Sequence, residues 1–106
     1  TVLLGDKAVK SCLIPVGKMV GESITTIEGL SEEGEFSVLQ QSFIDCFASQ
    51  CGYCIPGFIM AATSLLVENS DPTVQEIREG LSGNLCRCTG YVKIIDAVKQ
   101  AAIKEA

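Results

Sequence analysis

The spacing of apolar residues along the chain changes near residue 30. Before that point, short runs rich in apolar and β-branched residues, at 2–4, 8–14 and 24–27, are separated by turns that contain glycine. Such runs predict short β-strands. Because three short strands bury too little surface to be stable alone, we expect residues 1–30 to be a piece of a larger unit.

After residue 30, apolar residues recur every three or four positions, which is typical of amphipathic helices. Four such stripes predict the helical core. They consist of Phe36, Leu39, Phe43 and Phe47; of Phe58, Ala62, Leu65 and Leu66; of Val74, Ile77 and Leu81; and of Tyr91, Ile94, Ile95, Val98 and Ala102. Four helices with short connections favour a small bundle. The predicted fold class is therefore α+β, with an all-α four-helix domain at 31–106 after a short β segment at 1–30.

Local signals indicate where these helices begin and end. The glutamates within 31–35 favour the start of the first helix, because carboxylates stabilise a helix N-terminus. Pro56 suits the first turn of the second helix. Thr73 and Glu76 form a capping box for the third helix, which Gly83 is expected to stop.

Composition limits the class of protein. The chain has 106 residues, so we expect one domain, or one domain and a fragment. Its net charge of −5 argues against nucleic-acid binding, which needs a basic face. No apolar run reaches about 18 residues and no signal peptide is visible, so we expect no membrane span and a cytoplasmic protein. A core of this size is marginal, and a bound metal would help the chain fold.

Four of the six cysteines form two close pairs. Cys51 and Cys54 lie in the segment Q-C-G-Y-C-I-P-G, Cys86 and Cys88 lie in N-L-C-R-C-T-G-Y, and the chain has no histidine. Four thiolates in two tight pairs predict one metal site closed by two distant segments, and sulfur ligands in that number select zinc or an iron–sulfur centre. Both pairs precede predicted helices, whose N-termini favour anionic groups.

The residues themselves leave the metal open. Structural zinc sites use C-x2-C pairs on both sides, often with histidine, whereas here one pair is C-x-C, which favours a 2Fe–2S cluster. The alternatives are a zinc-stapled helical protein-interaction module and a thiol-redox enzyme using Cys51 and Cys54, although no βαβ pattern accompanies that pair. Three disulfides, as in small secreted domains, are disfavoured because the chain lacks an export signal and is predicted to be helical.

The two cysteine motifs closely resemble those of the iron–sulfur subunit of the molybdenum hydroxylases. That family includes xanthine dehydrogenases, aldehyde oxidoreductases, nicotinate and quinoline dehydrogenases and aerobic carbon monoxide dehydrogenases, and the resemblance extends over essentially the whole chain. It implies a plant-type ferredoxin-like domain with one 2Fe–2S cluster, followed by a helical domain with a second. Residues 1–30 would then be the C-terminal remnant of the first domain, and residues 31–106 the second domain.

The resemblance also implies roles for particular residues. The ligands of the helical domain's cluster would be Cys51, Cys54, Cys86 and Cys88. Cys12 matches the fourth ligand of the ferredoxin-type cluster, whose other three ligands would precede this sequence, so Cys12 is expected to be an orphan thiol. Gln50 and Cys88 would face the molybdopterin of a partner subunit. No catalytic residue is expected on this chain.

The function implied by the resemblance is electron transfer. Electrons would pass from a molybdopterin centre on a large subunit, through the cluster of this chain, towards the ferredoxin-type cluster and FAD on a medium subunit. One 2Fe–2S cluster is expected here and two in a full-length subunit. The segments K-S-C-L-I-P-V and I-T-T-I-E-G-L look most like those of bacterial xanthine dehydrogenase small subunits.

Other residues near the motifs carry more local expectations. Gly52 and Gly90 are expected to let the backbone approach the sulfurs closely. Ile55 stands where the family usually has Thr or Ser, which costs about 1 kcal/mol of helix capping. Cys46 is expected to be a buried small hydrophobe rather than a ligand, and Arg87 to form a structural ion pair.

Overall fold

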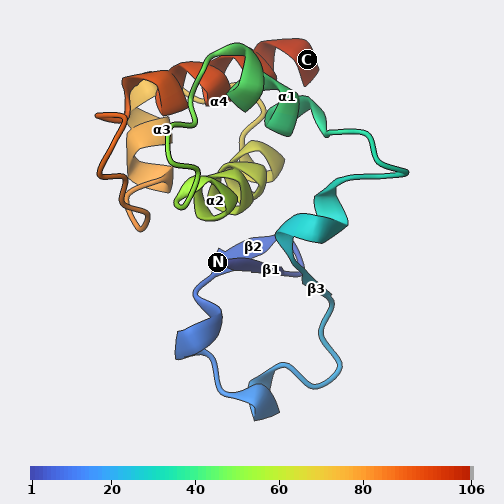
Figure 1. Ribbon diagram of the computed structural model, residues 1–106. Helices are drawn as coiled ribbons and strands as arrows, with labels where there is room; N and C mark the ends of the chain where they lie inside the picture. The colour runs from blue at the N-terminus through green and yellow to red at the C-terminus, as the bar shows by residue number, and fades with distance from the viewer. Residues whose placement is uncertain (106) are drawn as a thin grey trace.

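A small sheet and four helices make up the structure, a computed structural model that describes residues 1–105 (Figure 1). The strands are β1 (Val2–Leu4), β2 (Lys7–Val9) and β3 (Ile24–Thr25). The helices are α1 (Val38–Asp45), α2 (Ile55–Glu68), α3 (Val74–Gly80) and α4 (Val92–Glu105). Short 3-10 turns occupy η1 (Ser11–Leu13), η2 (Val16–Lys18) and η3 (Ile27–Leu30). These elements confirm the predicted α+β class, and none of the helices described is long and apolar enough to cross a membrane.

The sheet is antiparallel in the order β2-β1-β3 and lies against α2 (Figure 1). β1 pairs along its length with β2, from Val2 opposite Val9 to Leu4 opposite Lys7. A side chain of α2 fastens the hairpin: the Ser64 hydroxyl donates to the Asp6 carbonyl at 2.8 Å and accepts the backbone N–H of Ala8 at 3.1 Å. The sheet therefore depends on the helical part for its position.

The strand expected at 8–14 ends earlier, so that prediction was wrong in its second half. Val9 already pairs with Val2, at the start of β1, and no strand within residues 1–105 lies opposite the residues that follow. The chain instead turns into η1, in which the Leu13 N–H donates to the Lys10 carbonyl at 2.9 Å. A strand needs a partner for its backbone groups, and a local turn satisfies them when none is present.

Helix α2 forms the centre of the core. Five consecutive residues, Phe58 to Ala62, are buried, so the helix is covered on all sides rather than along one stripe. It contacts α1, α3, α4, β1 and β2. Of its predicted stripe, Phe58 and Ala62 are buried, and Leu65 and Leu66 pack half-buried against the core.

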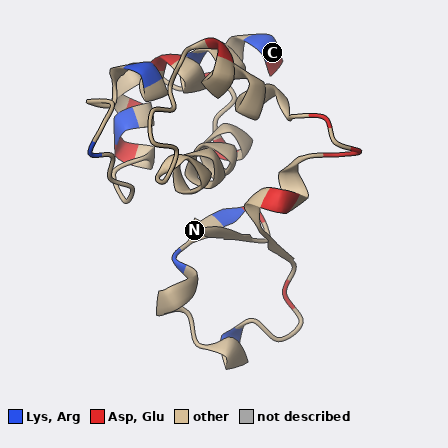
Figure 2. Cartoon of the chain, viewed as in Figure 1, with Lys and Arg blue, Asp and Glu red and all other residues tan. Residues whose placement is uncertain are grey.

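Helix α1 is shorter than the apolar spacing predicted. Leu39 and Phe43 are buried, but Phe36 and Phe47 lie outside the helix and are 60% and 75% exposed. The helix begins at Ser37, whose hydroxyl accepts the Gln40 N–H at 3.2 Å while the Gln40 side chain accepts the Ser37 N–H at 2.8 Å. This capping box overrides the glutamates of 31–35, which lie in a projecting loop (Figure 2).

Helix α3 has the predicted capping box and a different end. The Thr73 hydroxyl accepts the Glu76 N–H at 3.2 Å, and the Glu76 carboxylate accepts the Thr73 N–H at 3.0 Å. The helix ends at Gly80 rather than Gly83. Gly80 lies close to α2, because a Cβ there would lie 3.1 Å from the methyl groups of Leu65.

Helix α4 closes the bundle against α1. Its predicted stripe is confirmed at Ile94, Val98 and Ala102, which are buried, while Ile95 is half-buried. Tyr91 lies just before the helix and is 37% exposed, so it is not part of the buried stripe.

We expect the substitution Ile94→Ala to lower the free energy of unfolding by about 2–5 kcal/mol, because it removes a fully buried side chain and leaves a cavity. Ile103→Ala on the same helix is the matched control, since Ile103 is 68% exposed, and should change it by no more than about 0.5 kcal/mol. Chemical denaturation measures both. Equal losses in the two variants would contradict the packing of α4 described above.

Candidate metal centre

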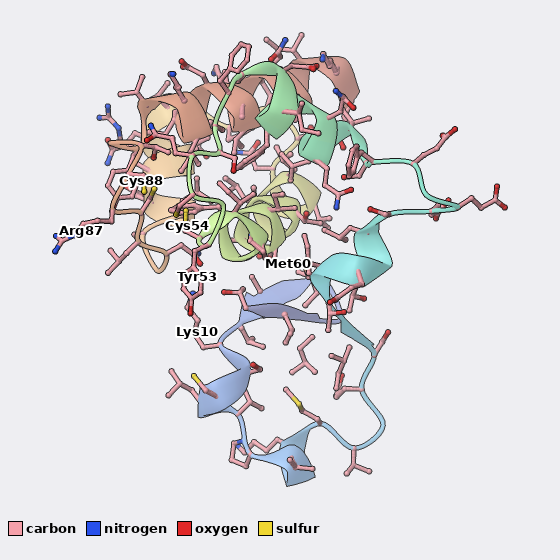
Figure 3. The ribbon with its side chains drawn as sticks, viewed as in Figure 1. Lys10, Tyr53, Cys54, Met60, Arg87 and Cys88 are labelled. Atoms are coloured by element: carbon pink, nitrogen blue, oxygen red, sulfur yellow. The ribbon has the colours of Figure 1, made fainter. Side chains whose placement is uncertain are left out.

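The two cysteine pairs come together although they are far apart in the sequence. Cys51 and Cys54 lie in the turn between α1 and α2, and Cys86 and Cys88 lie in the loop between α3 and α4. Figure 3 labels one cysteine of each segment, Cys54 and Cys88. Cys54 lies close enough to Cys86 for each to affect the other's pKa, and the same holds for Cys51 and Cys88. Each contact therefore joins the two segments.

Each of the four sulfurs has one main partner from the other segment and weaker contacts with the remaining ones. Each pair takes one cysteine from each segment, and all four cysteines are free thiols. Within residues 1–105, no three Cys, Asp or Glu side chains are grouped as ligands of a single metal ion. The structure brings all four cysteines to the same place. That the two segments bind one metal site together stays a prediction.

The first segment is shaped by left-handed residues. Phe47, with φ of 53°, turns the chain at the end of α1, and Gly52, with φ of 85°, turns it between the two cysteines. Cys54 then occupies the N-cap position of α2, with no capping hydrogen bond from its side chain. In the first turn, the Ile55 N–H donates to the Gly52 carbonyl at 3.4 Å and Pro56 has no N–H. The positive end of the helix dipole still favours negative charge at this position.

The expectation that Ile55 replaces a capping residue of α2 was wrong. Ile55 is the first residue of α2 and is half-buried, whereas the N-cap is Cys54. A hydroxyl at position 55 would therefore not occupy the capping position. The helix start is instead adapted to a sulfur at the N-cap and to Pro56 in the first turn.

The second segment is held by a closed set of hydrogen bonds. The Cys86 sulfur accepts the Thr89 hydroxyl at 3.1 Å and the Thr89 N–H at 3.3 Å. The Tyr91 N–H donates to the Thr89 hydroxyl oxygen at 3.1 Å, and the Cys86 N–H donates to the Tyr91 hydroxyl at 3.0 Å. Sequence reasoning missed both hydroxyls, because nothing in the spacing alone shows which way they point.

The aromatic ring of Tyr91 connects this loop to the core. It meets the ring of Phe58 edge to face, with the ring centres 6.2 Å apart. Phe58 is buried in the first turn of α2, beside the other cysteine pair. Tyr91 has φ of 74° and follows Gly90 with φ of 70°, so two successive left-handed residues direct the chain into α4.

The two segments also touch where Gly57 meets Asn84. A Cβ on Gly57 would lie 2.7 Å from the Asn84 side-chain oxygen. That oxygen accepts the Lys10 ammonium group at 3.2 Å, which links the loop to the end of the hairpin. Asn84, in the C-x-C loop, therefore contacts both α2 and the end of the hairpin.

Within each pair, the surroundings lower the pKa of one thiol and raise the pKa of the other. The hydrogen bond from the Thr89 hydroxyl is the largest influence on Cys86 and lowers its pKa to about 7. Burial, followed by the contact with Cys86, raises the pKa of Cys54 to about 11. The backbone N–H of Tyr53 lowers the pKa of Cys51, while the hydrogen bond with Cys51 raises that of Cys88. Each contact thus pairs a sulfur that favours the thiolate with one that favours the thiol.

Three of the four cysteines, Cys51, Cys54 and Cys86, line a hollow of about 400 Å³ that opens at the surface. Cys54 and Cys86 are half-buried at its inner side, and Cys51 and Cys88 are exposed. Two exposed side chains of apolar character line this hollow: Tyr53 is 94% exposed and Leu85 is 81% exposed.

The remaining predicted residues lie as follows. Gln50 is exposed and directly precedes Cys51. Arg87 points outward (Figure 3) and forms no ion pair within the part of the chain described, so the expected structural ion pair was wrong. Cys12 is exposed in η1, beyond the sheet and apart from the two pairs. Cys46 is half-buried and its thiol donates to the Gln100 side chain at 2.7 Å, consistent with the expected packing role.

Comparisons with known proteins bear on this site. Residues 26–99 match the model of the 2Fe-2S binding domain family. The nicotinate dehydrogenase small FeS subunit of Eubacterium barkeri is 48% identical over 101 residues, which cover 95% of this chain and 64% of that subunit. The xanthine dehydrogenase iron-sulfur-binding subunit of Escherichia coli O157:H7 is 45% identical over 100 residues, covering 92% and 63%. These identities are similar, so they do not single out xanthine dehydrogenase.

A solved structure resembles the whole chain. Quinoline 2-oxidoreductase from Pseudomonas putida 86 superposes with a TM-score of 0.92 at 46% identity, covering 99% of this chain and 65% of that chain. The chain therefore spans just under two thirds of the length of these relatives.

We expect Gly52→Ala to lower the free energy of unfolding by about 1–2 kcal/mol, because a side chain is disfavoured at a left-handed φ of 85°. Gly17→Ala is the control: Gly17 has open space around its Cβ direction and no such φ, so its effect should stay within about 0.5 kcal/mol. Both are measured by denaturation of the metal-free protein. A neutral Gly52→Ala would show that the turn between the cysteines is not so constrained.

Proposed function

The chain belongs to the 2Fe-2S binding domain family, and on that premise we propose that it binds one 2Fe–2S cluster and transfers electrons as the iron–sulfur subunit, or part of it, of a molybdenum hydroxylase. The observation that carries the proposal is the convergence of four free thiols from two distant segments. When bound, such a cluster takes up and releases one electron.

The donor set supports this group. A 2Fe–2S cluster is held by four cysteine thiolates. The proposed ligands are Cys51, Cys54, Cys86 and Cys88. The contacts Cys51–Cys88 and Cys54–Cys86 bring these four thiols together across the two segments. The family assignment favours this over the zinc-stapled module and the thiol-redox enzyme.

The residues around the sulfurs can stabilise the negative charge of such a site. Cys54 lies at the start of α2, where the helix dipole favours negative charge, and the backbone N–H groups of Tyr53 and Thr89 reach the sulfurs of Cys51 and Cys86. Hydrogen bonds and burial at the ligands are the means by which a protein adjusts the reduction potential.

The exposed side of the site supports a proposal about the partner. Cys51 and Cys88 are exposed, and the apolar side chains of Tyr53 and Leu85 stand open beside them. Exposed apolar patches of this kind are typical of protein–protein contacts. We propose that a large molybdopterin-binding subunit covers this face, with Gln50 and Cys88 towards the pterin, and that a medium FAD-binding subunit completes the complex.

The first 30 residues support a second proposal. We propose that residues 1–30 belong to a ferredoxin-like domain and residues 31–106 form the helical domain, with Cys12 a ligand of the first domain's own cluster. In favour, Leu13, Val16 and Val20 are at least 74% exposed, which leaves an apolar surface for another part of the protein to cover.

Iron analysis and visible absorption test the cluster directly. We expect about two iron atoms per chain and a red-brown colour that fades when dithionite reduces the cluster. A colourless protein with one zinc per chain would contradict the proposal and support the zinc-stapled module. Reversible titration of two accessible thiols in an iron-free protein would support the thiol-redox enzyme instead.

We expect Cys86→Ser to lose most of the bound iron and to lower the melting temperature, because the site joins two distant segments. Cys46→Ala is the control: its thiol bonds Gln100 and contacts neither pair, so iron content should be unchanged. Iron analysis and thermal unfolding of both variants provide the measurement. If Cys86→Ser retains full iron, the ligand assignment is wrong.

A further inference from the structure

The C-x-C loop contains a side chain placed to act on one sulfur without being a ligand. Resting on the function proposed above, we infer that Thr89 is a positioning residue that raises the reduction potential of the cluster through its hydroxyl bond to the Cys86 sulfur. This assigns a task to the Thr of C-R-C-T-G-Y that the ligand pattern alone does not require.

The geometry commits the hydroxyl proton to the sulfur. The Thr89 hydroxyl oxygen accepts the Tyr91 N–H at 3.1 Å, so its own proton is left to donate, and the Cys86 sulfur lies 3.1 Å away. The bond is anchored at both ends, because the Cys86 N–H is held in turn by the Tyr91 hydroxyl at 3.0 Å. Three residues thus form a ring of hydrogen bonds within the loop.

The backbone keeps this ring in place. Gly90 and Tyr91 both have left-handed φ values, of 70° and 74°, so the loop is held in a conformation that a relaxed chain would seldom adopt. Thr89 is half-buried, and the Tyr91 ring packs on Phe58. The Thr89 hydroxyl is therefore held against the Cys86 sulfur and does not turn towards solvent.

The contact distinguishes Cys86 from the other proposed ligands. Among residues 1–105, the hydrogen bonds that join a hydroxyl to one of these four sulfurs involve Cys86 alone. The site is thus asymmetric: the pair Cys54–Cys86 carries the extra donor, and the exposed pair Cys51–Cys88 does not.

The direction of the effect follows from charge. Reduction adds one negative charge to the cluster and its ligands, and a hydrogen bond to a charged acceptor is stronger than one to a less charged acceptor. The Thr89 hydroxyl therefore stabilises the reduced state more than the oxidised state. Removing it should make reduction harder, which is a lower potential.

The test compares Thr89→Val, which keeps the shape and removes the hydroxyl, with Thr89→Ser, which keeps the hydroxyl. Thr63→Val is a matched control, because the Thr63 hydroxyl bonds the Ile59 carbonyl within α2. Each protein is titrated with dithionite while visible absorption is recorded, and iron content is measured in parallel. We expect Thr89→Val to lower the equilibrium constant for reduction about threefold to tenfold, or about 30–60 mV at about 59 mV per tenfold change.

The outcomes separate the inference from the proposed function. Wild-type potentials in Thr89→Ser and Thr63→Val, with a lower potential in Thr89→Val at full iron, support it. An unchanged potential in Thr89→Val at full iron overturns it and leaves the cluster proposal standing. A wild-type protein without a 2Fe–2S cluster overturns both.

If Thr89→Val loses its iron, the inference is tested on the wild-type protein and Thr89→Ser by resonance Raman spectroscopy in D2O. Hydroxyl protons exchange quickly in D2O, so a hydroxyl bond to a ligand sulfur should shift the iron–sulfur stretching bands of the resonance Raman spectrum soon after transfer. Shifted bands in both the wild-type protein and Thr89→Ser support the inference, and bands that stay unshifted overturn it.

Discussion

The structure depends on one helix that is buried on every side. α2 places Phe58 to Ala62 in the core, so the other helices and the sheet must each cover part of its surface. Burial of apolar area is the main favourable contribution to folding, and α2 and α4 each contribute five buried apolar residues. The start of this helix is also where the cysteine pairs meet, with Cys54 at its N-cap. Whatever fixes α2 in the core therefore fixes half of the candidate site.

The other half of the site is fixed by local bonds as much as by packing. The loop carrying Cys86 and Cys88 has a ring of hydrogen bonds of its own through Thr89 and Tyr91, and touches α2 through Phe58 and Gly57. A loop braced in this way can hold its sulfurs near their positions before a metal arrives. A preformed site loses less conformational entropy when it binds a ligand. The resulting site is asymmetric, with an inner pair that is half-buried and an outer pair that is exposed.

Much of the fold could be predicted, and the failures share a cause. The capping box at Thr73 and Glu76 was correct because its bonds are local, and the buried positions of α4 follow from its spacing. Phe36 and Phe47 fit the same spacing but lie outside α1, because the cap at Ser37 and the turn at Phe47 limit the helix to eight residues. The segment beyond Val9 failed for a similar reason: its strand needed a partner that is absent from the described residues. Apolar periodicity gives the face of an element but not its ends.

The sequence by itself determined the chemistry: four thiols in C-x2-C and C-x-C pairs without histidine, which the family match to a 2Fe-2S binding domain supports. This was possible because ligand type and spacing are properties of the sequence. The tertiary structure alone decided which sulfurs meet, Cys51 with Cys88 and Cys54 with Cys86, and which hydroxyl reaches one of them. The contacts between the sulfurs join residues on different segments, so they form only once α2 and α4 have packed. The Thr89 bond lies within one loop and depends on the left-handed turn at Gly90 and Tyr91.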